Sequence, residues 1–226
     1  MVLIYLKTMA LETVDAEQLS AKLQLSEVER ARESRFRDPN VRLQFLAGRA
    51  LLHDLMAERF PGQAFQCPPD AEGKPHLAFE QGGEAPNFSI AHSEALAGVA
   101  MTDGARVGLD VERLGRIIDP RVARRFFSKG ETDWLETLSE SEAARNRLRV
   151  WCLKEAVVKA MGTGIAGQYK RFTIPPEGTA PLFEAGHGEE QKSWSCIERS
   201  SADHLLALAV DRSGDRTQIE HSYFVP

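Results

Sequence analysis

Hydrophobic and polar positions switch between strand-like and helix-like spacing along the chain, which predicts a mixed α/β fold. A short apolar run predicts a first strand at about 2–8, and another predicts a last strand near 219–224. Leucines recur at helical intervals after the helix-start signals Asp38 and Pro39. Ser26 followed by Glu29 forms a capping-box pattern, which predicts a helix that begins there.

The middle of the chain predicts strands followed by helices. Residues 88–113, "FSIAHSEALAGVAMTDGARVGLDVER", are expected to form strands joined by a turn at 102–104. Separate helices are then expected at about 119–127, 129–138, 139–147 and 148–161. After Gly164 the pattern indicates strands and turns again.

Two segments of the sequence have a similar pattern, which suggests a duplicated architecture. "LAGVAMTDG" (96–104) and "LALAVDRSG" (206–214) match in pattern at an offset of 110 residues. This match fits two related α/β lobes, 1–104 and 105–226, although chance similarity between two hairpin strands explains it equally well.

Composition narrows the class of protein. No apolar run approaches the ~20 residues that cross a bilayer, and "MVLIYLKTMA" fits a strand better than a signal peptide. Three widely separated cysteines without metal-ligand spacing indicate a reducing compartment, and we expect a cytoplasmic protein. With 28 lysines and arginines against 33 acids, the net charge of −5 argues against nucleic-acid binding.

The arginines nevertheless gather in two groups, at 30–49 and at 113–125. Such local basic surfaces on an acidic chain suit a small polyanionic ligand or an acidic partner. Solvated helix faces paired with nearby glutamates explain any single arginine as well.

Two segments carry candidate chemistry. In a strand "VGLDVER", Asp110 and Glu112 point to the same face, where a cation such as Mg²⁺ would relieve their repulsion. A solvated edge strand is the commoner explanation of such a pair. In the helix "WCLKEAVVKAMGTGI", Trp151, Glu155 and Lys159 share one face. Glu155 and Lys159 could form a structural salt bridge, or Glu155 could complete a magnesium site with Lys159 directed to a phosphate.

Taken together, these segments resemble the 4′-phosphopantetheinyl transferases of the Sfp type, in the holo-[acyl-carrier-protein] synthase superfamily. "VGLDVER", "RRFFSKGETDWL" and "WCLKEAVVKAMGTGI" are similar to three motifs of that family in order and spacing, and "GKPHL" and "FSIAHS" are similar to two upstream ones. The likeness runs from about Glu29 to Gly167. It implies two similar α/β lobes related by pseudo-twofold symmetry, with the active site at the seam.

The resemblance implies transfer of the 4′-phosphopantetheine arm of coenzyme A to a serine of an apo carrier protein, with release of adenosine 3′,5′-bisphosphate. The carriers are acyl, peptidyl or aryl carrier proteins of fatty acid, polyketide or nonribosomal peptide synthesis. Asp110, Glu112 and Glu155 match the Mg²⁺ ligands, and Glu155 is also a candidate acceptor of the serine proton. Lys159 matches the lysine that contacts phosphate and favours the leaving group.

The resemblance also assigns coenzyme A binding to basic residues of the N-terminal lobe. His92 matches a pyrophosphate-binding histidine and Lys74 a phosphate-contacting lysine, while Arg49, assisted by Arg32, matches a position near the 3′-phosphate. A surface helix position for Arg49 and a satisfied loop histidine at residue 92 are the structural alternatives. Ala91 departs from the family, which usually has a serine there.

The resemblance also bears on Glu131 and on the arginines at 113–125. Glu131 matches a family glutamate, although a helix cap with Ser128 explains it equally well. The arginines at 113–125 form a candidate docking surface for an acidic carrier protein. Partners are otherwise limited to coenzyme A, without nucleic acid or membrane, and we expect a monomer.

Two other functions compete with the transferase. A magnesium-dependent nucleotide phosphodiesterase or pyrophosphatase could use the same three acids. A non-catalytic coenzyme A or carrier-protein binding module is the third possibility, although such a module usually lacks one of the acids.

Overall fold

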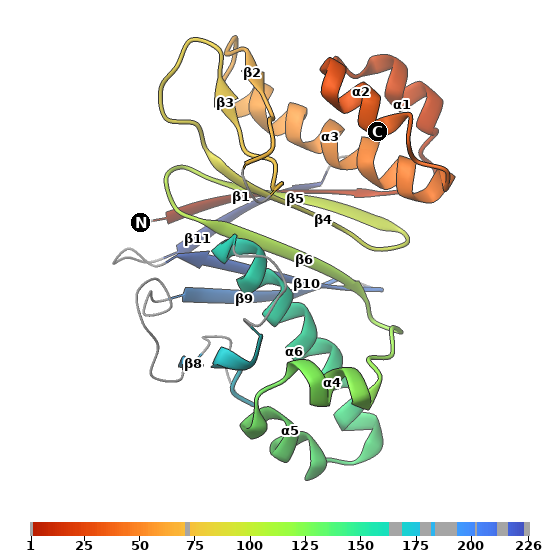
Figure 1. The fold of residues 1–226 in the computed structure, drawn as a ribbon, viewed down its shortest axis with the longest axis vertical. Helices are drawn as coiled ribbons and strands as arrows, with labels where there is room; N and C mark the ends of the chain where they lie inside the picture. The colour runs from red at the N-terminus through yellow and green to blue at the C-terminus, as the bar shows by residue number, and fades with distance from the viewer. Residues whose placement is uncertain are drawn as a thin grey trace. The chain divides into compact units, whose positions relative to one another are not determined.

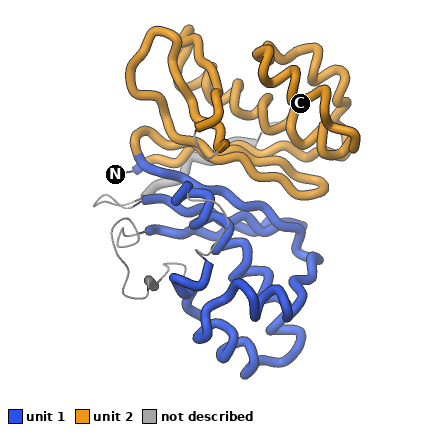
Figure 2. Tube along the Cα trace, viewed as in Figure 1, with its two compact units in different colours: residues 1–2, 105–217 blue, residues 3–104, 218–226 orange. Residues whose placement is uncertain are grey.

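The computed structural model describes residues 2–70, 73–162, 169–176, 182–183, 194–201, 203–211 and 217–223. These residues form groups of helices and antiparallel strands, which confirms the predicted mixed α/β class (Figure 1). The chain divides into two compact units, named here by their order in the sequence: a first unit of residues 3–104 and 218–226, drawn in orange in Figure 2, and a second unit of residues 1–2 and 105–217, drawn in blue. None of the helices described is long and apolar enough to cross a membrane.

The first unit is built on a four-stranded sheet covered by a long helix. The sheet has the order β11-β1-β5-β4, with strands β1 (Val2–Ala10), β4 (Asn87–His92), β5 (Leu96–Thr102) and β11 (Thr217–Tyr223). Helix α3 (Pro39–Arg59) packs on β5 and β4, and α1 (Ala16–Lys22) and α2 (Glu27–Glu33) pack on α3. A small hairpin joins β2 (Phe65–Gln66) to β3 (Ala78–Phe79).

The second unit repeats this plan with a three-stranded sheet. Its order is β6-β10-β9, with strands β6 (Val107–Arg113), β9 (Trp194–Ser200) and β10 (His204–Asp211). Helix α6 (Glu140–Met161) packs on β6 and β10, and α4 (Pro120–Phe126) and α5 (Lys129–Glu136) pack on α6. The short 3₁₀ helix η1 (Tyr169–Arg171) leads into the small hairpin of β7 (Phe172–Thr173) and β8 (Leu182–Phe183).

The helix starts read from the sequence are confirmed, but one helix boundary is wrong. Ser26 and Glu29 form the predicted capping box, and Asp38 caps α3 with Pro39 in its first turn. The two helices expected at 139–147 and 148–161 are the single 22-residue helix α6, which Ser139 caps. No glycine or proline interrupts residues 140–161, so the backbone has no reason to break there.

The two units share one topology. Each runs strand, long helix and strand pair, as β1–α3–β4–β5 and as β6–α6–β9–β10, and in each the last of these strands lies between the other two. The matching segments begin in β5 and β10, which therefore hold equivalent places and favour related halves over chance similarity. Pseudo-twofold symmetry in space stays a prediction. The final strand β11 extends the first sheet beside β1, although it comes after the strands of the second sheet in the sequence.

Two glycines let the long helices approach their sheets. A Cβ atom on Gly108 of β6 would lie 1.9 Å from the carbonyl oxygen of Ala156 and 2.6 Å from the nitrogen of Ala160, both in the backbone of α6. A Cβ atom on Gly48 of α3 would instead meet a side chain, with Cγ2 of Ile90 at 2.7 Å and no backbone atom among its nearest neighbours. Gly108 is therefore the position where strand and helix backbones meet most closely in the motif "VGLDVER".

Gly108→Ala should lower the free energy of unfolding by about 3 kcal/mol, because backbone atoms of α6 cannot yield as a side chain can. Urea denaturation followed by circular dichroism measures the change. The matched variant Gly48→Ala should stay within about 1 kcal/mol of the parent, since Ile90 can rotate and alanine favours the helix. Equal losses in the two variants would show that the contact with α6 is not the cause.

Candidate active site

The acidic residues of β6 lie on the face that Gly108 presents to α6. Asp110 and Glu112 follow Gly108 at intervals of two, and pairing with β10 sets Asp110 opposite Ala207. Both carboxylates are buried, each with 6% of its residue surface exposed. The alternative of a solvated strand is therefore wrong for these two acids, which are buried although β6 is at the edge of its sheet.

Each of the three predicted metal ligands has a partner within the second unit. Lys159 Nζ donates to Asp110 Oδ1 at 2.7 Å, so the ammonium of α6 reaches across to β6. Arg116 forms an ion pair with Glu112. The hydroxyl of Tyr169 donates to Glu155 Oε1 at 2.7 Å. Asp110 is thus a partner of Lys159, which the helical spacing alone had paired with Glu155.

The three acids influence one another electrostatically. Burial raises the pKa of Glu112, against the effect of its hydrogen bond to Arg116, and the charge of Asp110 raises it further. Burial also raises the pKa of Glu155, which the Tyr169 hydroxyl lowers and the charge of Asp110 raises. Burial is the larger cause of both shifts, and a cation among these carboxylates would relieve the smaller contribution from the charge of Asp110.

The donor set fits a hard cation, although the side chains are not gathered around one point. Among the described residues, no three histidine, cysteine or acidic side chains form a group that could hold a metal ion. Each acid is turned to its own partner instead, as Arg116 holds Glu112 and Tyr169 holds Glu155. However, Asp110 Oδ2 is buried and accepts no hydrogen bond from the described residues. This oxygen could therefore ligate a cation.

An aromatic cluster borders the acids. The rings of Trp151 and Tyr169 stack, with centroids 5.9 Å apart and planes inclined by 13°. Phe126 meets both rings edge-on, at 5.9 and 5.5 Å. The guanidinium of Arg116 lies 5.9 Å from the Trp151 ring centroid. The acids therefore have a cationic side chain and an aromatic cluster as neighbours.

A second ionic pair of α6, missed in the sequence, is structural. Lys154 is fully buried, pairs with the equally buried Glu131 at 3.0 Å, and donates to the carbonyl oxygens of Tyr169 and Phe172, each at 2.6 Å. Glu131 also accepts from the backbone N–H groups of Ser128 and Ile174. Glu131 therefore caps the start of α5 and holds the backbone at Ile174. The sequence signal of Glu131 was the capping box. Lys154 interrupts the apolar stretch of the helix, but helical spacing does not show which acid it contacts.

The basic residues assigned to coenzyme A lie in the first unit. Arg49 is buried and its Nε lies 2.9 Å from Glu29, so the alternative of a surface helix position is wrong. The guanidinium groups of Arg32 and Arg49 both lie against the ring of Phe45, at 5.6 and 5.4 Å from its centroid. Arg32 is exposed.

The other two coenzyme A residues lie on a turn and a strand end. Lys74 is partly buried in a turn where its backbone N–H donates to Asp70 Oδ1 at 2.7 Å. His92 is exposed at the end of β4, and not in a loop. Ala91 beside it is buried, so an apolar group fills the position where the family usually has a hydroxyl. Gly164, expected to turn the chain after α6, lies outside the described residues, whereas Gly162 caps α6 with φ of 74°.

Comparison with known proteins gives consistent matches. The family model of the 4′-phosphopantetheinyl transferase superfamily matches residues 106–209. The chain is 31% identical over 191 residues to the 4′-phosphopantetheinyl transferase HetI of Nostoc sp., an alignment that covers 82% of this chain and 78% of HetI. A putative 4′-phosphopantetheinyl transferase of Synechocystis sp. is 30% identical, with 81% and 73% covered. The 4′-phosphopantetheinyl transferase psf-1 of Bacillus pumilus is 28% identical, with 91% and 89% covered.

Proposed function

The chain belongs to the 4′-phosphopantetheinyl transferase superfamily, and from this premise we propose that its β6–α6 acids carry out the transfer step. The arm of coenzyme A passes to a serine hydroxyl of an apo carrier protein. The observation that supports this use of the acids is the buried Asp110, whose Oδ1 contacts Lys159 and whose Oδ2 accepts no hydrogen bond from the described residues.

In the proposed site, Asp110, Glu112 and Glu155 would hold Mg²⁺. When bound, the ion would neutralise the pyrophosphate oxygens of coenzyme A and stabilise the charge that develops on them. Binding the ion requires Arg116 to share or release Glu112, whereas Tyr169 contacts only one oxygen of Glu155. The basic residues Arg32, Arg49, Lys74 and His92 of the first unit stay predictions for gripping coenzyme A.

The protein's own groups would then move one proton and orient two reactants. The serine oxygen forms a bond to the β-phosphorus, and the bond from that phosphorus to the bridging oxygen breaks. Glu155 takes the serine proton, directly or through water. Lys159, already near Asp110, donates to phosphate and favours departure of adenosine 3′,5′-bisphosphate.

Intact mass spectrometry tests the proposal against its competitors. Incubating the protein with coenzyme A, Mg²⁺ and an apo acyl carrier protein or apo peptidyl carrier domain should add a phosphopantetheine group to the carrier. Cleavage of coenzyme A without a mass gain on the carrier would indicate the hydrolase. Neither product, together with measurable coenzyme A binding, would indicate the binding module.

The surface after β6 supports docking of an acidic carrier protein. Leu114 and Ile117 expose 43% and 79% of their surface between β6 and α4, in a segment that also carries Arg113 and Arg116. Arg121 on α4 is exposed and pairs with Asp119. Exposed apolar groups among arginines suit the acidic helices that carrier proteins present.

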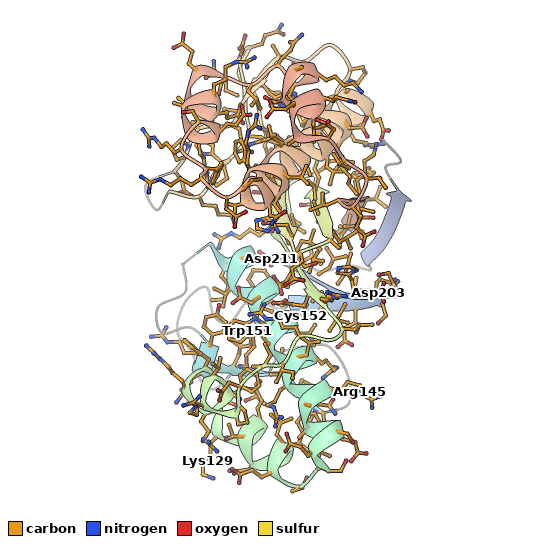
Figure 3. All side chains as sticks on the ribbon, turned by 90° about the vertical axis from the view of Figure 1, so that its right-hand side faces the viewer. Lys129, Arg145, Trp151, Cys152, Asp203 and Asp211 are labelled. Atoms are coloured by element: carbon orange, nitrogen blue, oxygen red, sulfur yellow. The ribbon has the colours of Figure 1, made fainter. Side chains whose placement is uncertain are left out.

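Reversing charge in this surface should weaken carrier binding selectively. The double variant Arg121→Glu/Arg124→Glu should raise the KM for the carrier protein by about tenfold, because like charges would meet, and leave the KM for coenzyme A unchanged. Steady-state kinetics at low ionic strength measures both constants. Arg145→Glu is the matched control, since Arg145 is also an exposed arginine of the second unit but lies on α6 and not on α4 (Figure 3). An unchanged KM in the double variant would remove α4 from the docking surface.

A further inference from the structure

Tyr169 is held at both ends by consecutive residues of α6. The ammonium of Lys154 donates to the carbonyl oxygen of Tyr169 at 2.6 Å, and the Tyr169 hydroxyl donates to Glu155 Oε1 at 2.7 Å. The first contact fixes the backbone of η1 against the helix, and the second fixes the tip of the side chain. Only 1% of the Tyr169 surface is exposed.

Ring contacts leave the hydroxyl little freedom. The Tyr169 ring stacks on Trp151, one helical turn before Glu155, and the edge of Phe126 closes another side at a centroid distance of 5.5 Å. The contacts with Trp151 and Phe126, together with the hydrogen bond from Lys154 to its backbone, hold the Tyr169 ring in one orientation. The direction of its O–H bond toward Glu155 is therefore built into the fold.

This geometry matters for a glutamate that must act in one orientation. A glutamate side chain loses rotamer entropy when it is fixed in one orientation. A hydrogen bond from a rigidly held hydroxyl offsets that loss before substrate arrives. Of the three acids, Glu155 is the one whose partner in the described part of the site is a neutral hydroxyl on a rigid ring.

We propose that Tyr169 is a positioning residue for the transfer reaction: its hydroxyl sets the orientation of the Glu155 carboxylate. The inference rests on the proposed function, because it gives Glu155 a role in the transfer step. Tyr169 itself is too buried to touch either substrate, so its effect should pass through Glu155 alone.

Tyr169→Phe tests the proposal because it keeps the aromatic contacts and removes only the hydroxyl. With coenzyme A, Mg²⁺ and an apo acyl carrier protein, kcat should fall about tenfold, while both KM values change less than twofold. Tyr5→Phe is the matched control, since Tyr5 is also a buried tyrosine, and its hydroxyl accepts from Arg59 at 2.6 Å in the first unit. That control should keep the parent kcat. A parent-like kcat in Tyr169→Phe would overturn the proposal.

A second background separates positioning from a loss of stability. In Glu155→Asp the shorter carboxylate no longer reaches the hydroxyl, so adding Tyr169→Phe should change kcat less than twofold. A further tenfold fall in that background would overturn the proposal, because the effect would not pass through residue 155. If the parent transfers no phosphopantetheine at all, the proposed function fails, and this outcome is visible before any variant is compared.

Discussion

Glu155→Gln should lower kcat for phosphopantetheine transfer by about 10³, because the amide cannot accept the serine proton and ligates a dication poorly. The fold should survive the change, since the amide keeps an oxygen for the Tyr169 hydroxyl at nearly the same place. Intact-mass kinetics on an apo acyl carrier protein measures the loss, and circular dichroism measures the melting temperature.

A matched carboxylate elsewhere in the second unit controls for the general effect of removing a charge. Glu198 on β9 is partly buried and its Oε1 lies 2.7 Å from Arg149 Nε, so Glu198→Gln removes a comparable charge away from β6. We expect parent-like kcat in that variant. A Glu155→Gln variant that keeps more than a tenth of the parent kcat would exclude Glu155 as the essential acid.

Local sequence rules predicted much of the fold because they act over a few residues. Capping at Ser26 and Asp38 and the apolar stripe of α3 depend on neighbours within one helical turn. The segments that match in pattern begin in β5 and β10, which hold the same place in their two sheets. The break expected between 147 and 148 was wrong, since a helix continues where no residue stops it. The pairing of β11 with β1 joins the two ends of the chain, and no local signal reports it.

For the candidate site too, the sequence predicted positions along one strand or helix, but not contacts between distant segments. Strand alternation placed Asp110 and Glu112 on one face, and helical spacing placed Glu155 and Lys159 on another. Which group meets which acid depends on contacts across long stretches of chain, so Lys159 on Asp110 and Tyr169 on Glu155 could not be read from spacing. The sequence placed Arg116 among the docking arginines but did not indicate that it also pairs with Glu112. The buried environment of Lys154 was also invisible, because helical periodicity does not show which polar residue is enclosed.

Lys154→Met should be the most destabilising of the variants considered, lowering the free energy of unfolding by about 4 kcal/mol. Methionine has a similar length but leaves the fully buried Glu131 without its cation. It also removes the donor from the carbonyl oxygens of Tyr169 and Phe172. The three tryptophans, at 134, 151 and 194, all belong to the second unit, so their fluorescence during urea denaturation follows this unit.

Two comparisons identify the buried pair as the cause of that loss. Lys129→Met removes a lysine of the same unit whose ion pair with Asp133 lies at the surface, and it should leave the urea midpoint unchanged (Figure 3 labels Lys129). Lys154→Met combined with Glu131→Gln should be more stable than the sum of the two single losses predicts, because no buried charge then lacks a partner. Additive losses would mean that Lys154 acts only through the two carbonyl oxygens. In either case kcat should fall in Lys154→Met even where the chain is folded, since the backbone that carries Tyr169 to Glu155 loses its anchor.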